Sequence, residues 1–308
     1  MDEIILYGAG EQGTFTESLL YNNGLSVKGF CDSVKEGKCF CDGGREYPIL
    51  KIDDIVGKGY QVVVTISNRF DRGQITEMLE NRKITVIPLE ELLGEDKVTF
   101  KRNYAANYHL TSMDNYYKGA EDEANLAKFW DEESIFYQMF CSLDLTNVVE
   151  LACGRGRHVP HYIENAGHIT LVDILEKNIL YCRERFSNEN KISYYINNGY
   201  DLQKLESESY TSLFTYDAMV HFESLDVFKY LVETYRILKK GGKALFHHSN
   251  NTEDYRASFE SARQARSYMS RDLFAHFADR AGFKVIQQHV IDWYGDKELD
   301  CLTLVIRP

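Results

Sequence analysis

The chain has 308 residues, which is enough for about two domains with a substantial core. Its net charge of −12 argues against a protein that binds nucleic acid, because such proteins present a net basic face to the phosphate backbone. We find neither a cleavable signal peptide nor an apolar stretch of about 18 residues, so we expect a cytoplasmic protein that does not span a membrane.

Residues 1–95 have the pattern of a small Rossmann-like unit. A short buried-strand pattern at residues 4–7 leads into Gly8, Gly10 and Gly13, which form a G-x-G-x-x-G sequence just before a helical stretch. The other elements predicted in this unit are strands at residues 27–31, 61–66 and 84–87 and a helix at residues 71–81. This is half a Rossmann fold, in which the three glycines and Asp32 are candidates for binding a nucleotide.

The cysteines of this unit raise the question of a zinc site. Cys31, Cys39 and Cys41 are close in sequence, but they contain no C-x-x-C pair and have no histidine nearby. A structural zinc site usually needs four ligands, so we expect no metal. The seven cysteines of the chain, which include Cys153 in a glycine-rich loop, fit reduced thiols better than a disulfide framework.

The first unit resembles the N-terminal nucleotide-sugar-binding domain of bacterial sugar N-acetyltransferases. The similarity lies in residues 7–10, 29–32 and 66–69. It implies that the unit binds a nucleotide or a nucleotide-sugar. Two alternatives stay open, a dinucleotide site and a packing and dimerisation module that has kept only the fold.

Residues 96–140 are expected to form a helical linker and lid. Four tyrosines cluster in a polar stretch, at positions 104, 108, 116 and 117. Apolar residues at helical spacing predict helices at residues 124–130 and 134–140. Aromatic rings suit a lid because they stack on sugar faces, which makes Trp130 a candidate for binding the substrate; ordinary helix packing is the alternative.

A nucleotide-binding crossover follows. A strand pattern at residues 148–151 contains Glu150 and leads into Gly154 and Gly156, and a second strand pattern ends at Asp173, 19 residues after Gly154. Glycines permit close approach of a ligand, and the carboxylate can accept hydrogen bonds from two ribose hydroxyls. Val159 replaces the third glycine of the dinucleotide fingerprint, so we expect a ligand with a ribose but no phosphates.

Over about residues 125–308 the chain resembles the class I S-adenosylmethionine-dependent methyltransferases. The matching segments, in order, are residues 150–156, 172–173, 198–202, 213–223 and 238–246. The resemblance implies a methyltransferase domain at residues 141–308 with S-adenosylmethionine as cofactor. The implied cofactor-binding residues are Glu150, Ala152, Gly154, Gly156, Asp173, Ile174, Asn198, Gly199, Tyr200 and Tyr216. The predicted fold class is thus α/β with two Rossmann-like domains, a half-Rossmann unit and a class I methyltransferase fold.

Candidate catalytic residues lie at the predicted strand ends. Transfer to a hydroxyl requires a base, and neutral imidazole suits this role near pH 7. His221 follows the fourth strand, where Asp217 is placed to orient it, and His247 and His248 end the fifth. Because strand side chains alternate, we expect only one of these two to face the pocket.

Two further segments resemble a subgroup of small-molecule and sugar O-methyltransferases. Residues 246–250 and 266–270 carry this similarity, which makes Asn250 and Arg266 candidates for binding substrate. Ser270 has the pattern of a helix cap, and a solvated surface residue is the alternative for Arg266.

We therefore expect an S-adenosylmethionine-dependent methyltransferase that acts on a small polar acceptor, a sugar or nucleotide-linked sugar hydroxyl. An N-methyltransferase on a small metabolite and a cofactor-binding scaffold or sensor remain alternatives. A nucleic-acid enzyme is disfavoured, because residues 215–218 are Thr-Tyr-Asp-Ala instead of Asn or Asp followed by Pro-Pro and an aromatic residue. The sequence leaves open whether the chain is a monomer or a homodimer.

Overall fold

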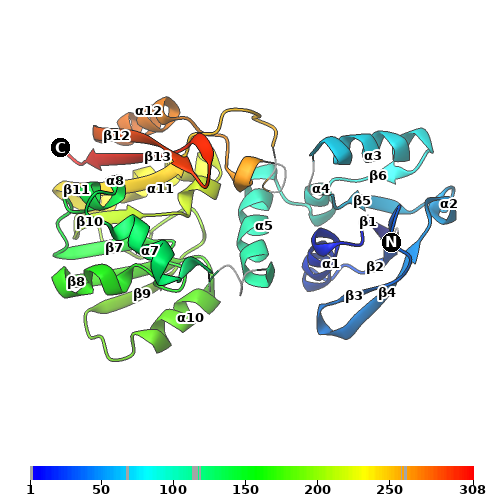
Figure 1. The fold of residues 1–308 in the computed structure, drawn as a ribbon, viewed down its shortest axis with the longest axis horizontal. Helices are drawn as coiled ribbons and strands as arrows, with labels where there is room; N and C mark the ends of the chain where they lie inside the picture. Colours follow the sequence, from blue (N-terminus) through cyan, green and yellow to red (C-terminus); the bar gives the residue numbers. More distant parts are fainter. Residues whose placement is uncertain (1–2, 67–68, 113–116, 118, 258, 260–261) are drawn as a thin grey trace. The chain divides into compact units, whose positions relative to one another are not determined.

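Two separate sheets organise the chain (Figure 1). The computed structural model describes residues 3–66, 69–112, 117, 119–257, 259 and 262–308. It divides into two units, Met1–Ser112 and Met113–Pro308. Each unit is described by itself below.

The first unit is a parallel sheet with one antiparallel edge strand, in the order β3-β4-β2-β1-β5-β6. Its strands are β1 (Ile4–Tyr7), β2 (Val27–Cys31), β3 (Gly37–Cys41), β4 (Arg45–Leu50), β5 (Gln61–Val64) and β6 (Thr85–Val86). Its helices are α1 (Glu11–Asn22), α2 (Ile52–Ile55), α3 (Arg69–Asn81), α4 (Leu89–Leu93) and α5 (Lys97–Ser112). The predicted strands and helices of this unit are confirmed to within three residues at their ends.

Strand β1 is buried on both faces because it lies between β2 and β5 in the sheet. Ile4 and Leu6 pack into one apolar cluster, and Ile5 and Tyr7 pack into the other. This is the continuous apolar pattern expected of a central parallel strand. It explains why a run of only four residues predicted the strand correctly.

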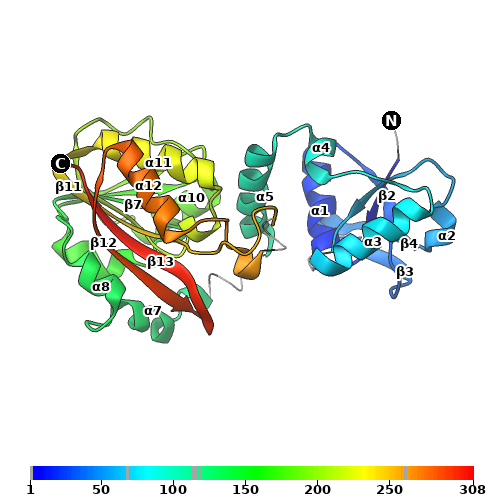
Figure 2. The same ribbon diagram turned by 90° about the horizontal axis from the view of Figure 1, so that it is seen from above.

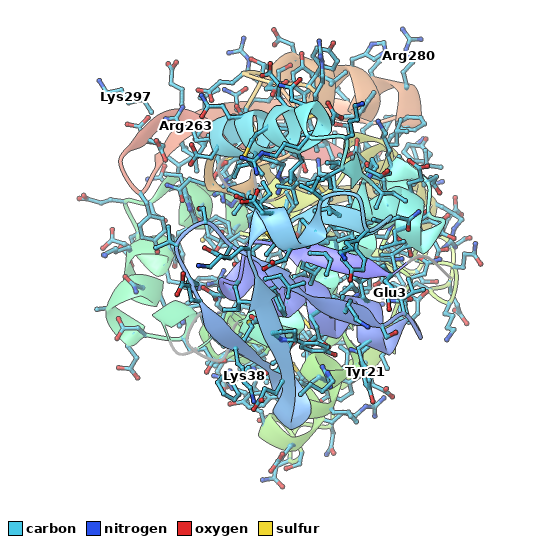
Figure 3. The ribbon with its side chains drawn as sticks, turned by 90° about the vertical axis from the view of Figure 1, so that its right-hand side faces the viewer. Glu3, Tyr21, Lys38, Arg263, Arg280 and Lys297 are labelled. Carbon is cyan, nitrogen blue, oxygen red and sulfur yellow. The ribbon has the colours of Figure 1, made fainter. Side chains whose placement is uncertain are left out.

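The hairpin of β3 and β4 was not predicted. A buried ion pair fastens it to α1: Arg45 donates to both carboxylate oxygens of Glu17, at 2.8 and 3.0 Å, and the Tyr47 hydroxyl donates to the same group at 2.8 Å. Glu17 is 1% exposed, so it depends on these partners. Tyr21 on α1 and Lys38 on β3 instead project from the surface (Figure 3).

Helix α5 belongs to the first unit, which therefore extends to Ser112 instead of ending at residue 95. Tyr104 on this helix is buried and packs edge-on against Phe15 of α1, with ring centroids 5.0 Å apart. The first part of the expected linker is thus a packed helix. Tyr116 lies outside the described residues.

The second unit is a sheet of seven strands in the order β12-β13-β11-β10-β7-β8-β9. Its strands are β7 (Asn147–Leu151), β8 (His168–Asp173), β9 (Ile192–Ile196), β10 (Tyr210–Thr215), β11 (Leu238–Ser249), β12 (Lys284–Trp293) and β13 (Asp296–Ile306). Its helices are α7 (Glu123–Trp130), α8 (Ile135–Phe140), α9 (Val159–Tyr162), α10 (Glu176–Arg185), α11 (Ser224–Ile237) and α12 (Arg271–Ala281). The short 3-10 turns of the chain are Asp42–Gly44, Ile163–Asn165, Met219–His221 and Arg263–Ala265.

The five strands from β9 to β11 run parallel, and β13 closes the sheet as an antiparallel neighbour of β11. In Figure 2 the hairpin of β12 and β13 follows β11, with α12 beside it. Apolar clusters cover both faces of the sheet. The predicted cap is confirmed, because the Ser270 hydroxyl accepts the Leu273 N–H at 3.0 Å. This doubly wound arrangement brings the carboxyl ends of the parallel strands to one edge, where such sheets bind ligands.

No helix within the described parts of the chain is both long enough and apolar enough to cross a membrane.

The close packing of Gly13 against Gly8 gives a testable prediction for the stability of the first unit. A Cβ at this position would lie 2.0 Å from the carbonyl oxygen of Gly8, whereas a Cβ on Gly73 in α3 would meet nothing within 4 Å. We expect Gly13→Ala to lower the free energy of unfolding by about 1–3 kcal/mol, because helix and loop must move apart. Gly73→Ala should stabilise the chain by up to about 1 kcal/mol. Denaturant unfolding of both variants checks this, and equal effects would contradict the close packing.

Candidate functional site

The candidate site lies at the carboxyl edge of β7, β8, β10 and β11, and a strained loop forms its base. Ala152, Gly154 and Gly156 all have positive φ, of 56°, 55° and 73°. A Cβ on Gly156 would lie 2.6 Å from the Phe186 ring, so this glycine serves packing inside the protein. A Cβ on Gly154 would meet only the Tyr117 ring, at 3.5 Å. Gly154 is therefore the position at which a ligand can approach the backbone.

Asp173 holds this loop in place from the end of β8. Its Oδ2 accepts the Gly154 N–H at 2.9 Å, and its Oδ1 accepts the Leu175 N–H at 2.8 Å. Burial raises the pKa of Asp173 to about 6, although the backbone hydrogen bonds act in the opposite direction. Oδ2 accepts this one backbone N–H from Gly154, so its second lone pair can accept a hydrogen bond from a ligand hydroxyl.

Asn178 and Tyr117 extend the hydrogen bonding beyond Asp173. The Asn178 amide donates to Asp173 Oδ1 at 3.2 Å and to the Tyr117 hydroxyl at 2.9 Å. The Arg155 guanidinium lies over the Tyr117 ring, 4.2 Å from its centroid. Tyr117 thus lies against the glycine loop.

The turn after β9 contains three of the predicted cofactor residues. The Asn198 side chain accepts the N–H groups of Tyr200 and Asp201, at 3.1 and 3.0 Å, and Gly199 has a φ of 86°. The side chain of Asn198 therefore shapes the turn. Ile174, the residue after Asp173, is half-buried.

Glu150 is buried below the loop. Its Oε2 accepts the Tyr162 hydroxyl at 2.7 Å, and its Oε1 has no hydrogen-bond partner in the described structure. Burial raises the pKa of Glu150 to about 8. At neutral pH this side chain is thus mainly a neutral carboxylic acid.

Arg157 and Asp217 form an ion pair at the tip of β10, with Nη2 and Oδ2 2.9 Å apart. Burial raises the pKa of Asp217, but the Arg157, His247 and His221 charges outweigh it and lower the pKa overall. Asp217 also has a φ of 54°, in the left-handed region that costs a residue with a Cβ roughly 1–2 kcal/mol. Strain of this kind clusters at functional sites.

His221 lies in the 3-10 turn that follows this tip. Its Nδ1 is 2.8 Å from the carbonyl oxygen of Ala265. A carbonyl can only accept a hydrogen bond, so the proton is assigned to Nδ1, and Nε2 carries the basic lone pair.

His247 and His248 point to opposite sides of β11, as the alternation of strand side chains requires. His248 is buried against the Phe274 ring, with centroids 3.8 Å apart, and Thr303 Oγ1 lies 2.8 Å from its Nε2. Burial lowers the pKa of His248 to about 3. The structure does not bring His248 into the site.

His247 and Arg266 meet at a second buried carboxylate. Arg266 donates to both oxygens of Asp300, at 2.9 and 2.6 Å, and His247 Nε2 lies 3.1 Å from Asp300 Oδ2. Burial raises the pKa of Asp300, but hydrogen bonds from His247 and Arg266 lower it to about 2. Arg266 is only 4% exposed, so its guanidinium is committed to this pair and does not face a substrate.

The other predicted residues of the site are also held by the protein. Trp130 stacks on His161, with centroids 4.9 Å apart. Tyr216 is buried, and its ring centroid lies 4.2 Å from that of Phe136. Asn250 donates to the Glu298 carbonyl at 2.9 Å and accepts the Arg271 N–H at 2.9 Å. Packing thus accounts for these three positions.

The glycine loop of the first unit is held by hydrogen bonds and close packing at most of its predicted positions. The Ala9 N–H and the Val34 and Lys35 N–H groups all donate to Asp32, at 2.9, 2.8 and 3.0 Å. Gly8 has a φ of 115°, and a Cβ there would lie 2.9 Å from Ile66 and Thr65. Gly13 packs against the Gly8 carbonyl, and only Gly10 has open space around its Cα. Three of the four predicted positions therefore stabilise the turn itself.

Sequence reasoning missed three residues of the second unit, Arg157, Asn178 and Asp300. Arg157 directly follows the glycine loop and Asn178 lies five residues after Asp173, so sequence position gave a signal for both. Asp300 gave no such signal, because its partners Arg266 and His247 lie 34 and 53 residues away in the sequence. Within the described residues, no group of three or more His, Cys, Asp or Glu side chains is placed to hold a metal ion.

Residues 149–246 match a family model described as a methyltransferase domain. A chain in the complex between the Haloferax volcanii Trm112 methyltransferase activator and a methyltransferase has a TM-score of 0.50 at 18% identity, covering 65% of this chain and 97% of that chain. An S-adenosylmethionine dependent methyltransferase from Mesorhizobium loti gives 0.47 at 15% identity, covering 56% and 97%. No curated protein matches the chain by sequence. The match to the first of these structures shows a shared fold.

The Glu150 carboxyl predicts how stability depends on pH. Its pKa is higher in the folded chain than the ordinary value of 4.5, so the folded state binds the proton more tightly. The contribution of Glu150 to the free energy of unfolding should therefore fall as pH rises from about 4.5 to about 8, by at most about 1.4 kcal/mol per pH unit. Glu150→Gln should flatten this slope.

Urea unfolding of the ligand-free chain between pH 5.5 and 8.5 measures the slope. Glu164→Gln, at an exposed position nearby, serves as the matched control and should keep the wild-type slope. A Glu150→Gln variant with the same slope as wild type would show that Glu150 does not titrate in this range.

Proposed function

We propose that the second unit, whose residues 149–246 match a methyltransferase domain, transfers a methyl group from S-adenosylmethionine to a hydroxyl of a small polar acceptor, a sugar or nucleotide-linked sugar. The observation that carries the hydroxyl assignment is the hydrogen bond from His221 Nδ1 to the Ala265 carbonyl. It leaves Nε2 as a proton acceptor near the tip of β10. Asp217 lies near the same tip, where it pairs with Arg157.

The residues at the glycine loop fit a cofactor that has a ribose and no phosphates. A Cβ on Gly154 would meet the Tyr117 ring at 3.5 Å, an ordinary contact distance, and a carboxylate stands at the end of the neighbouring strand. Gly154, Asp173 and the turn at Asn198 would hold the cofactor. Bound S-adenosylmethionine supplies a methyl group that its sulfonium already activates.

The protein then has three tasks, which are to orient the acceptor, exclude water and remove the hydroxyl proton. His221 Nε2 takes that proton. Asp217 is ionised near neutral pH, because its pKa is lowered, and it stabilises the imidazolium that forms. Arg157 fixes the carboxylate through their ion pair.

The first unit supports the sugar-type acceptor. It has the strand, glycine loop and helix of a mononucleotide-binding half, and Gly10 at the start of α1 is open. We propose that a nucleotide binds there, either the nucleotide part of the acceptor or a regulatory nucleotide. Asp32 then acts by holding the loop, because its carboxylate already accepts three backbone N–H groups.

A thermal-shift panel on the full chain tests these assignments, since a ligand that binds only the folded state raises the melting temperature. The panel contains S-adenosylhomocysteine, UDP-, GDP- and CMP-sugars, and NAD. We expect shifts with S-adenosylhomocysteine and with one class of nucleotide-sugar, followed by formation of S-adenosylhomocysteine in a turnover assay. A shift with NAD alone would contradict the proposal, and cofactor binding without turnover would favour a scaffold or sensor.

Asp173→Ala should weaken S-adenosylhomocysteine binding by about 2–4 kcal/mol, because the ribose hydroxyls lose their acceptor and the loop loses the bond to Gly154. Isothermal titration calorimetry on the folded variant measures this. Asp279→Ala, which changes an exposed Asp on α12, is the control and should bind like wild type. Unchanged affinity in the Asp173 variant would remove Asp173 from the cofactor site.

His221→Ala should lower the single-turnover rate by roughly 10²- to 10⁴-fold, the range for loss of a general base, with cofactor affinity nearly unchanged. His276→Ala on α12, at an exposed position, is the matched control. Single-turnover rates measured at saturating acceptor concentration over a range of pH distinguish a general base from a residue that only binds the acceptor. A near-wild-type rate in the His221 variant would exclude it as the base.

A further inference from the structure

Asp217 adopts a backbone conformation that residues with a Cβ avoid. Its φ is 54°, and it directly follows β10 and Tyr216 at the edge where the acceptor approaches. Such a conformation persists only where the surroundings determine it. The question is which contacts hold it.

A hydrogen bond to the Asp217 peptide comes from β11, where His247 accepts it. The Asp217 N–H donates to His247 Nδ1 at 3.0 Å. Nδ1 is then an acceptor, so the ring proton must be on Nε2. Nε2 in turn donates to Asp300 Oδ2 at 3.1 Å. Both ring nitrogens are therefore in use, and this ring is fully buried.

Asp300 and Arg266 fix the orientation of that ring. Arg266 binds both oxygens of Asp300, and the Oδ2 that receives its 2.6 Å bond also receives the His247 N–H. Asp300 is fully buried, and the Trp293 ring centroid lies 4.9 Å from the centroid of the His247 ring. The imidazole has one tautomer and one orientation that satisfy all these partners.

We propose that His247 is a positioning residue for the methyl transfer: it holds the Asp217 peptide in its left-handed conformation and so directs the Asp217 carboxylate onto Arg157. Asp300 and Arg266 set the tautomer that makes this possible. The inference rests on the proposed function, in which Asp217 serves the base His221. It gives His247 a role other than proton abstraction, and it gives Arg266 a role other than substrate binding.

Two substitutions of His247 separate the two hydrogen bonds. The Asn side chain places its oxygen where the His Nδ1 lies, so His247→Asn can still accept the Asp217 N–H but cannot reach Asp300. The Gln side chain places its terminal amide where Nε2 lies, so His247→Gln can still donate to Asp300 but offers no acceptor to Asp217. Both variants remove the same ring from the same buried site.

The experiment uses the full chain saturated with S-adenosylhomocysteine, and hydrogen exchange at the Asp217 amide is the first readout. We expect His247→Gln to exchange about tenfold faster or more, and His247→Asn to remain within about threefold of wild type. Calorimetric affinity for S-adenosylhomocysteine, together with thermal unfolding, checks that both variants are folded.

Single-turnover rate with the acceptor from the panel is the second readout. It should follow the exchange data, with His247→Gln slower than His247→Asn by about tenfold or more. Equal exchange in the two folded variants would overturn the inference. Equal loss of rate in both would do so too, because that is the behaviour of a proton-transferring His247. Failure of wild type to bind S-adenosylhomocysteine would instead overturn the proposed function.

Discussion

A carboxylate at the end of one strand holds the glycine loop at the end of its neighbour, and each unit depends on this interaction. In the second unit Asp173 accepts the Gly154 N–H at 2.9 Å, and in the first unit Asp32 accepts the Ala9 N–H at 2.9 Å. Gly8 in the first loop and Gly154 and Gly156 in the second adopt positive φ, and a buried backbone N–H beside such a turn needs an acceptor. The carboxylate at this position thus stabilises the loop whether or not a ligand is bound.

The two units differ in what the carboxylate and its loop leave for a ligand. Asp32 binds three backbone N–H groups, and Lys35 donates to the Ala9 carbonyl, so the first loop is closed from both sides. Asp173 accepts two backbone N–H groups and an Asn178 amide, and a Cβ on Gly154 beside it would meet the Tyr117 ring at 3.5 Å. The methyltransferase match at residues 149–246 covers this second loop.

Local pattern was enough to predict β1, β2, β5, β7 and β8 and the two glycine loops, because burial on both faces of a parallel sheet leaves short, continuous apolar runs. It failed for the hairpin of β3 and β4, whose inward-facing side chains include two cysteines and which an ion pair between Arg45 and Glu17 ties to α1. It also failed for Arg266, whose place is decided by Asp300, 34 residues later. A charged residue in a loop can be read as a ligand contact from sequence, and only the fold reveals a buried partner.

The central claim is that the loop at Gly154 and the carboxylate of Asp173 form a cofactor site for methyl transfer. A crystal structure of the full chain with S-adenosylhomocysteine tests it most directly. The account predicts both ribose hydroxyls within hydrogen-bonding distance of the Asp173 oxygens, with the methionine part along the loop at Gly154. A ligand bound elsewhere on the chain, or a ribose turned away from Asp173, would contradict it.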